Sequence, residues 1–285
     1  MSAQSEPATR HGVLLEVAYD GTNFSGWATQ PGRRTVQETL DGAIRALDPN
    51  ASAGRGTSRT DAGVHAEGQR VAFDASLPLP PRGWVLALNS HLPDDVAVRS
   101  AREIHVGYNP RFSSKTKRYR YRLLLDRVRD PLLRDRAWRV GWALDLEKMN
   151  REAAQIVGTH DFDAFRSAHD ERQATVRIMT RAEIVRENER IASFVIEGNA
   201  FLYNMVRILV GTLVDVGRAK LKEGAIARAL ENPLLSEESG EQSRDPSSRR
   251  SDRRKLAGMT APAHGLTLER IDLDLPEGPS ASWPR

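Results

Sequence analysis

The chain of 285 residues contains no cysteine. This absence excludes disulfide bonds, a thiolate nucleophile and cysteine-ligated zinc, and it favours a reducing, cytoplasmic setting. No apolar run is long enough to span a bilayer, and the polar segment Met1–Gly12 lacks the apolar core of a signal peptide. We therefore expect a soluble cytoplasmic protein that makes no membrane contact.

A large excess of one charge sign is also missing: 42 Lys and Arg stand against 38 Asp and Glu, a net charge of +4. That balance does not establish nucleic-acid binding. The distribution is more informative, because cations cluster around Tyr119 and Tyr121: Arg111, Lys115, Lys117, Arg118, Arg120 and Arg122. Interleaved cations and aromatics suit a polyanion with stackable bases, but they also suit a solvated strand edge. Composition leaves both interpretations open.

Hydrophobic periodicity predicts alternating strands and helices. Strands are expected at 13–19, 69–73, within 94–125, and at 175–186, 190–197 and 260–275. Helices are expected after Thr35 (with Glu38 completing a capping box), at 83–89, from Asp145 and at 201–216. On the basic strand, Tyr119 and Tyr121 would share one face and Arg118, Arg120 and Arg122 the other.

These elements predict an α+β protein of two domains. The expected boundaries are a flexible tail at 1–12, an N-terminal α+β domain at 13–112, a C-terminal α+β domain at 113–275 and a second flexible tail at 276–285. Residues 236–255 are rich in Ser, Glu and Arg and are expected to form a disordered loop.

The helix predicted at 201–216 is apolar nearly all round, which indicates burial, yet Arg207 stands in its middle. A buried guanidinium costs several kcal/mol (order of magnitude) unless a carboxylate meets it. Arg207 therefore predicts an acidic partner elsewhere in the chain. The alternative is an arginine whose head reaches the helix rim.

The segment Ser58–Ala66 places a single carboxylate, Asp61, at a tight turn. Gly63 allows a positive φ there, and Arg59 places a cation two residues before the carboxylate. Asp61 is thus free to face a ligand, with Arg59 beside it to hold an anion. An Asp that only caps its own turn is the competing interpretation.

Several segments resemble the TruA family of tRNA pseudouridine synthases. The matching motifs occur in family order: Tyr19–Thr22, Phe24–Trp27, Thr35–Glu38, Arg59–His65, Leu88-Asn89 with Leu92-Pro93, Arg111–Ser113 with Arg118–Tyr121, Phe201–Gly211, and Thr260–Pro262 with Gly265-Leu266. The resemblance covers about residues 13 to 275.

This resemblance implies an isomerase, an intramolecular transferase that converts uridine to pseudouridine at positions 38, 39 and 40 of the tRNA anticodon stem-loop. It implies a pseudouridine-synthase fold: two α/β subdomains, a central antiparallel sheet with helices on one side, and the active cleft between the subdomains. It further implies a homodimer, with neither cofactor nor metal.

The resemblance also implies roles for individual residues. Asp61 would be the nucleophile, Tyr119 would stack on the uracil and assist proton removal at C5, and Arg207 would pair with Asp61. Arg59 would help to hold the target nucleotide out of its stack. The remaining substrate contacts would be to phosphates, from Arg111, Lys115, Lys117, Arg118 and Arg120. Tyr121 better fits a half-buried core tyrosine.

The sequence departs from the family pattern at several points. Ser58 stands where Gly is usual, Ala28-Thr29-Gln30 follows Trp27 where a basic residue is common, and Asn109 replaces a His before Pro110-Arg111. The 236–255 segment is longer than is typical. If the backbone at Ser58 needed a positive φ, serine would cost on the order of 1 kcal/mol. These departures concern substrate range more than chemistry.

Two other functions use the same residues. A non-catalytic RNA-binding or tRNA-folding protein would need the basic strand but not Asp61. A metal-dependent phosphoesterase would use Asp61, His65, His160, Asp161 and Asp163, although the spacing of His160–Asp163 matches no known ligand set.

Overall fold

The structure, a computed structural model, describes residues 10–231 and 254–275, which divide into two compact units. Unit 1 combines the described parts of Met1–Lys115 and Leu268–Arg285, and unit 2 takes those of Thr116–Thr267. The predicted domain boundary lies between residues 112 and 113, whereas unit 1 extends to Lys115. Unit 1 also takes in most of the last strand, from Leu268 onward, which the prediction places in the C-terminal domain. Most of the predicted tails, and all of the predicted 236–255 loop except Arg254 and Lys255, lie outside the described residues.

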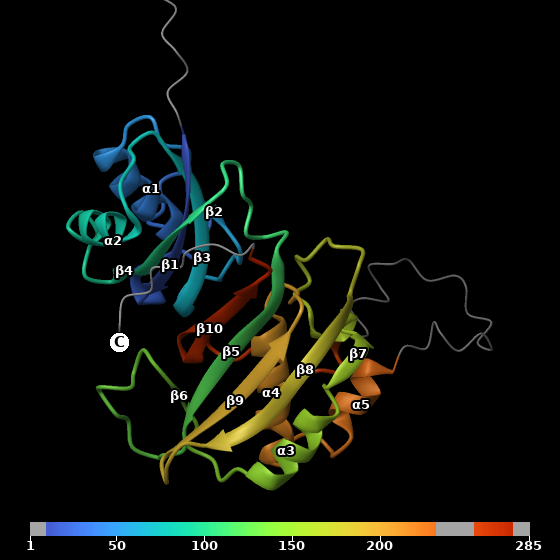
Figure 1. Ribbon diagram of the computed structural model, residues 1–285. Coiled ribbons are helices and arrows are strands. Elements are labelled where there is room, and N and C mark those ends of the chain that lie inside the picture. The colour runs from blue at the N-terminus through green and yellow to red at the C-terminus, as the bar shows by residue number, and fades with distance from the viewer. Residues whose placement is uncertain (1–9, 232–253, 276–285) are drawn as a thin grey trace, which may run out of the picture. The chain divides into compact units, whose positions relative to one another are not determined.

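Unit 1 is a sheet with two helices on one face (Figure 1). Its strands lie in the order β4 (Val96–Ile104), β1 (His11–Tyr19), β3 (His65–Ala75) and β10 (Leu266–Leu273), and the two-residue β2 (Arg55–Gly56) pairs with β3. β1 is antiparallel to both of its neighbours. The helices are α1 (Val36–Leu47) and α2 (Pro81–Asn89), and the 3-10 turn η1 (Gly21–Asn23) follows β1.

The start of α1 corrects one prediction. Thr35 is the N-cap residue as expected, but its side chain makes no capping hydrogen bond, so the predicted capping box is wrong. Thr35 is fully buried. The predicted apolar stripe is buried at Val36, Leu40, Ala43 and Ile44. Burial of that stripe, more than the cap, therefore stabilises the helix.

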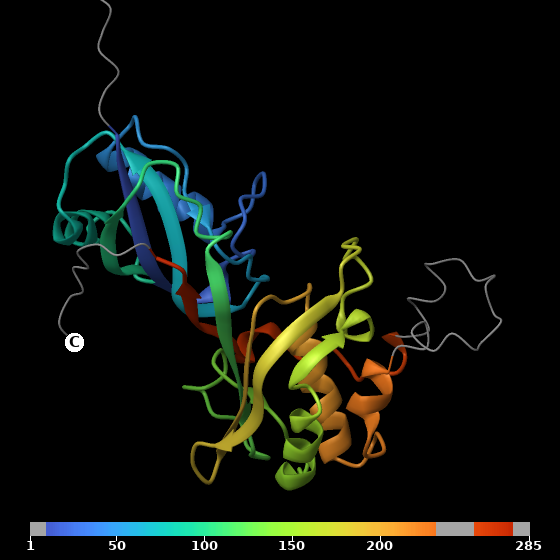
Figure 2. The same cartoon turned by 45° about the vertical axis from the view of Figure 1, so that its right-hand side comes forward.

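Unit 2 places its helices on one face of an antiparallel sheet (Figure 2). The strand order is β5 (Ser114–Leu124), β9 (Ile191–Gly198), β8 (Val176–Arg186) and β7 (Gly158–Asp161), with β6 (Trp138–Arg139) pairing parallel to the end of β5. The helices are α3 (Leu146–Ala154), α4 (Met205–Gly217) and α5 (Ala225–Leu230), with 3-10 turns η2 (Asp163–Phe165) and η3 (Ala263–Gly265). The predicted α+β class is confirmed; β6, β7 and α5 were not predicted.

Helix α4 is the core of unit 2. Every residue in it except Arg207 is buried. It begins at Met205, later than the expected Phe201, because Asn204 has φ 61° and ends the preceding turn in the left-handed region. A Cβ on Gly211 would collide with the carbonyl of Met259, so the returning segment lies directly against the helix. Within the described ranges, no helix has the length and apolarity to cross a membrane.

Candidate active site

The predicted catalytic loop is the connection between β2 and β3 in unit 1. Asp61 is half-buried there and Arg59 is exposed, so solvent reaches both residues. Gly63 has φ 77°, which confirms the predicted positive φ, and the Val64 N–H donates to the Asp61 carbonyl at 3.1 Å. The loop is therefore a true tight turn with a carboxylate at its corner.

One buried side chain, Gln69 of β3, holds the start of this loop. Its Nε2 donates to the Ser58 carbonyl at 2.6 Å, and its Oε1 accepts from the Ser58 N–H at 3.2 Å. Gln69 is 0% exposed and Ser58 is 6% exposed, so neither backbone group has ready access to solvent. Gln69 thus takes over the hydrogen bonding of the backbone three residues before Asp61.

The same geometry explains the serine at position 58. Asn204 and Ala219 are the non-glycine residues with positive φ in the described ranges, and Ser58 is not among them. The backbone strain considered for Ser58 is therefore absent.

Segment 19–27 supports the loop from the other side. The Tyr19 hydroxyl lies 2.7 Å from Thr60 Oγ1, and the Trp27 N–H donates to the Thr60 carbonyl at 3.0 Å. Gly26 has φ 99°, and a Cβ there would lie 2.8 Å from the Thr60 oxygen. Any side chain at Gly26 would therefore push the two segments apart.

His65, at the start of β3, closes the loop. Its Nδ1 accepts the Gly21 N–H at 3.1 Å, and a Cβ on Gly21 would collide with the Val64 carbonyl. The same Nδ1 also lies 3.1 Å from Asp20 Oδ1. His65 has a structural position here and gives no support to a metal ligand.

Sequence reasoning missed Gln69 and Thr60 as parts of the site. The sequence did contain a signal for Gln69, because period-two spacing places it on the same buried face of β3 as Val71 and Phe73. A polar residue at such an inward position needs a hydrogen-bond partner. Thr60 carried no comparable signal, since its partner Tyr19 is 41 residues away.

In unit 2, β5 carries the predicted tyrosines and arginines on opposite faces, as expected. Tyr119 and Tyr121 are buried, whereas Arg118, Arg120 and Arg122 are partly exposed. The Tyr119 ring packs edge-on against Phe201, with the centroids 4.9 Å apart, and is 7% exposed. Phe201 therefore limits the orientations open to the Tyr119 ring.

Tyr121 is a core residue, as predicted. It is 0% exposed, and its hydroxyl donates to the Pro262 carbonyl at 2.8 Å. Burial raises the pKa of Tyr121 well above its usual value, against the smaller opposing effect of the Arg207 charge. A phenol held protonated in this way is a hydrogen-bond donor and not a base.

Arg207 is half-buried on α4 and faces the Thr260–Pro262 motif. Its Nε donates to the Ala261 carbonyl at 2.8 Å, its Nη1 donates to Asn204 Oδ1 at 2.8 Å, and its own carbonyl accepts the Ala261 N–H at 3.0 Å. Because Pro262 receives the Tyr121 hydroxyl, this motif joins β5 to α4. The carboxylate partner expected for Arg207 stays a prediction.

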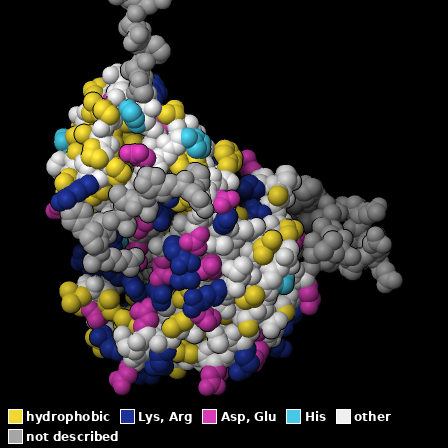
Figure 3. Space-filling view, in the orientation of Figure 1, with side chains coloured by type: hydrophobic (Ala, Val, Ile, Leu, Met, Phe, Trp, Pro, Cys, Tyr) yellow, Lys and Arg dark blue, Asp and Glu magenta, His cyan; other side chains and the backbone are white. Residues whose placement is uncertain are grey.

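The candidate phosphate-binding residues fall into two groups. Arg118 pairs with Glu197 at 2.8 Å, Arg120 with Glu187 at 3.0 Å, and Lys115 with Asp274 at 2.8 Å. Figure 3 shows basic and acidic side chains lying side by side on this face of the molecule. The Lys117 side chain is partly exposed. A cation already paired within the protein offers less to a phosphate than an unpaired one.

Arg111 belongs to the other group because it is exposed and no ion pair is recorded for it in the described part of the chain. Its N–H donates to Asn109 Oδ1 at 3.1 Å, which forms an Asx turn. The departure at Asn109 therefore has a structural role: it sets the backbone from which Arg111 projects.

The residues of the phosphoesterase alternative are engaged elsewhere. Asp163 pairs with Arg166 at 2.5 Å, Asp161 accepts the Asp163 N–H at 3.0 Å, and His160 Nε2 lies 3.0 Å from the Val157 carbonyl. Over residues 10–231 and 254–275, no three His, Asp or Glu side chains are grouped to hold a metal ion. The geometry gives this alternative no support.

The loop carries the chemistry that this chain offers: a carboxylate on a rigid turn, a cation beside it, and hydrogen bonds that fix the backbone on both sides. A carboxylate so placed can act as a nucleophile without a metal or a redox group.

Residues 16–113 and 153–247 match the family model described as tRNA pseudouridine synthase. A tRNA pseudouridine synthase A of Halalkalibacterium halodurans is 41% identical over 262 residues, covering 92% of each chain. Proteins of the same name from Acetivibrio thermocellus and Geobacter sp. strain M21 are 40% and 39% identical over 259 residues, covering 91% of this chain and 98% and 97% of theirs. The family model spans the candidate catalytic loop in unit 1 and much of unit 2, and the chain therefore belongs to the tRNA pseudouridine synthase family.

Proposed function

We propose that this protein isomerises uridine to pseudouridine at positions 38, 39 and 40 of the tRNA anticodon stem-loop, with Asp61 as the nucleophile. The observation that carries the proposal is the Asp61 turn, held by Gln69 and Thr60 in a chain of this family. The reaction breaks the N1–C1′ bond, turns the uracil and joins C5 to C1′. The proton leaves C5 and N1 gains one, so no oxidant or reductant is consumed.

We assign a chemical role to each of the three proposed catalytic residues. Asp61 attacks the substrate and leaves again, which divides one difficult step into two easier ones. Arg207 pairs with Asp61 and keeps it ionised, since a nearby cation lowers the pKa of a carboxyl group. Tyr119 contacts the uracil and assists removal of the C5 proton. A phenol with a pKa of about 10 needs its surroundings to assist it in that task.

Substrate capture is assigned to the cations. Arg59 helps to hold the target nucleotide out of its stack, because a base in a duplex must be extruded before chemistry can reach it. Arg111, Lys115, Lys117, Arg118 and Arg120 contact phosphates, which supply affinity and not sequence reading. We further propose that the enzyme works as a homodimer. We also propose that it works in the cytoplasm, in keeping with its lack of cysteine.

The test uses the full chain and an unmodified tRNA, without added metal. Pseudouridine formed at positions 38–40 would be labelled with carbodiimide and read as stops of reverse transcription. We expect stops with the wild type and none with Asp61→Asn. Arg134→Gln is a matched control, because its side chain is 77% exposed and lies outside the site. Undiminished activity in Asp61→Asn would refute the role of Asp61, and a wild type that binds tRNA without making pseudouridine would favour the RNA-binding alternative.

A further inference from the structure

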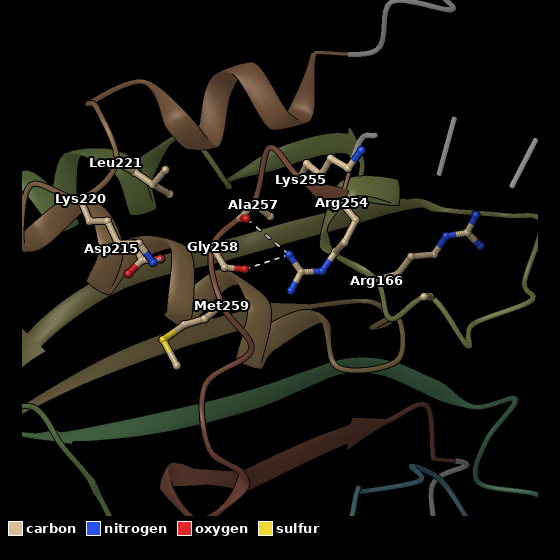
Figure 4. Close-up of a pocket in the computed structure, with 10 residues that line it drawn as sticks. Arg166, Asp215, Lys220, Leu221, Arg254, Lys255, Ala257, Gly258 and Met259 are labelled. Atoms are coloured by element: carbon tan, nitrogen blue, oxygen red, sulfur yellow. Dashed lines mark hydrogen bonds and ion pairs between the residues drawn. The ribbon is translucent and has the colours of Figure 1, made fainter. Parts of the chain in front are cut away.

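Unit 2 contains a concave site whose residues have no task in the proposed reaction. Its volume is about 780 Å³, within the range of small-molecule sites. It is lined by Asp215 of α4, by Lys220 and Leu221 after that helix, and by Arg254, Lys255 and the residues 257–259 (Figure 4). Asp61, Tyr119 and Arg207 are not among the lining residues.

The charge of this pocket is predominantly positive. Its lining includes Arg166, Lys220, Arg254 and Lys255 against a single carboxylate, Asp215. That carboxylate is already neutralised, since Asp215 lies 2.7 Å from Arg218 Nη2 and 3.4 Å from Lys220 Nζ. Arg166 has its own partner in Asp163. Among the lining residues that the structure describes, Arg254 is therefore the cation whose charge no described carboxylate offsets, and an anion that enters the pocket would meet it.

Arg254 is the origin of that excess. It is half-buried, and among the described residues its guanidinium donates to neutral acceptors alone: the Gly258 carbonyl at 2.8 Å, the Ala257 carbonyl at 3.4 Å and Thr260 Oγ1 at 3.3 Å. Figure 4 shows the bonds to the two carbonyls as dashed lines. Burial lowers the pKa of Arg254, so its charged form has lost hydration, and no carboxylate within residues 10–231 and 254–275 offsets that loss. Five N–H donors on a planar fork suit a phosphate, and these bonds leave donors to spare.

The other walls are apolar: Leu221, Ala257 and Met259 line the pocket, and Met259 is 41% exposed. We propose that this pocket binds a nucleoside phosphate, with Arg254 on the phosphate and the apolar wall against the nucleoside. The choice of a nucleoside rests on the proposed function, which brings RNA to this protein. The phosphate comes either from an RNA chain or from a free nucleotide, and the experiment separates these sources.

The test follows Met259, one of five methionines, as a local probe. The full chain would be labelled with ¹³C at its methionine methyl groups, and the Met259 resonance would be assigned with Met259→Leu. UMP should shift this resonance saturably, and uridine, which lacks the phosphate, should not. Met149 is 0% exposed in α3, and its resonance should stay in place.

Arg254→Gln should weaken the UMP-induced shift at least about tenfold, because a charge-assisted bond to phosphate is lost. Arg134→Gln should behave as the wild type. Lys220→Gln is the second variant, since its side chain is 58% exposed and the change is compatible with folding; it should weaken the shift less than Arg254→Gln. Equal UMP binding by wild type and Arg254→Gln, or a Met259 resonance that neither UMP nor tRNA moves, would overturn the proposal.

Unmodified tRNA distinguishes the sources. If RNA supplies the phosphate, tRNA alone shifts Met259, and Arg254→Gln reduces the salt dependence of tRNA affinity by about one phosphate contact. If the pocket takes only free nucleotides, tRNA leaves Met259 unmoved while UMP still shifts it. Both results support a nucleoside-phosphate site. The pseudouridine assay is separate, so a wild type that shifts Met259 with UMP but makes no pseudouridine refutes only the proposed function.

Discussion

Replacing Gln69 by methionine should slow the reaction far more than it weakens tRNA binding. The change preserves side-chain length and removes both hydrogen bonds to Ser58, at 2.6 and 3.2 Å. The Ser58 C=O and N–H would then be buried without partners, at roughly 1–3 kcal/mol each. The chain can relieve this cost by moving the loop toward water, but Asp61 then leaves its position.

The size of the effect follows from that relief. If displacement of the loop lowers the free energy of the variant by about 2–4 kcal/mol, the fraction of molecules with Asp61 in its original position falls roughly 30- to 900-fold. The single-turnover rate of pseudouridine formation at saturating tRNA should fall within this range. The dissociation constant for tRNA should change by less than about threefold, since the proposed phosphate contacts lie on other residues.

The matched control is Gln155→Met, because Gln155 is exposed at the end of α3. It makes the same chemical change without touching the loop, and its rate should equal that of the wild type. Thermal unfolding of both variants would show whether Gln69→Met acts by unfolding the protein. A folded Gln69→Met with a rate within about twofold of the control would refute the claim that Gln69 positions Asp61.

Three other predictions test the surrounding structure. Gly26→Ala should lower the melting temperature and the rate together, because its Cβ would lie 2.8 Å from the Thr60 oxygen at a φ of 99°; an unchanged melting curve would contradict this. Asp170 is buried, which alone would raise its pKa, but hydrogen bonds from the Arg172 side chain and the Tyr203 N–H lower it overall. A carboxyl group whose pKa is lower in the folded than in the unfolded protein stabilises the fold at pH values above its ordinary pKa of about 4, and this stabilisation is lost as the pH falls through the folded-state pKa. Asp170→Asn should therefore be less stable than the wild type at pH 7 and should lose less stability on acidification. For tRNA affinity measured against salt, Arg111→Gln should reduce the slope by about one contact and Arg118→Gln by less, since Arg118 already pairs with Glu197; equal slopes would contradict the effect of pairing.

Sequence alone determined the features that depend on local order. The alternation on β5 places Tyr119 and Arg118 on opposite faces because strand side chains repeat every two residues. The glycine at position 63 identifies a turn because it accepts a positive φ without strain. These local rules, with the family motifs, were enough to select Asp61, Tyr119 and Arg207 as the candidate residues and to predict an α+β fold.

Tertiary structure alone decided what each of these residues contacts. Gln69 reaches Ser58 across the loop, Arg207 meets the carbonyl of Ala261 54 residues away, and Arg254 donates to the carbonyl of Gly258. No sequence period encodes such pairings, because they depend on where strands and helices pack after the chain has folded back. The physical reason is the cost of burial: a polar group removed from water must find a partner wherever the fold provides one.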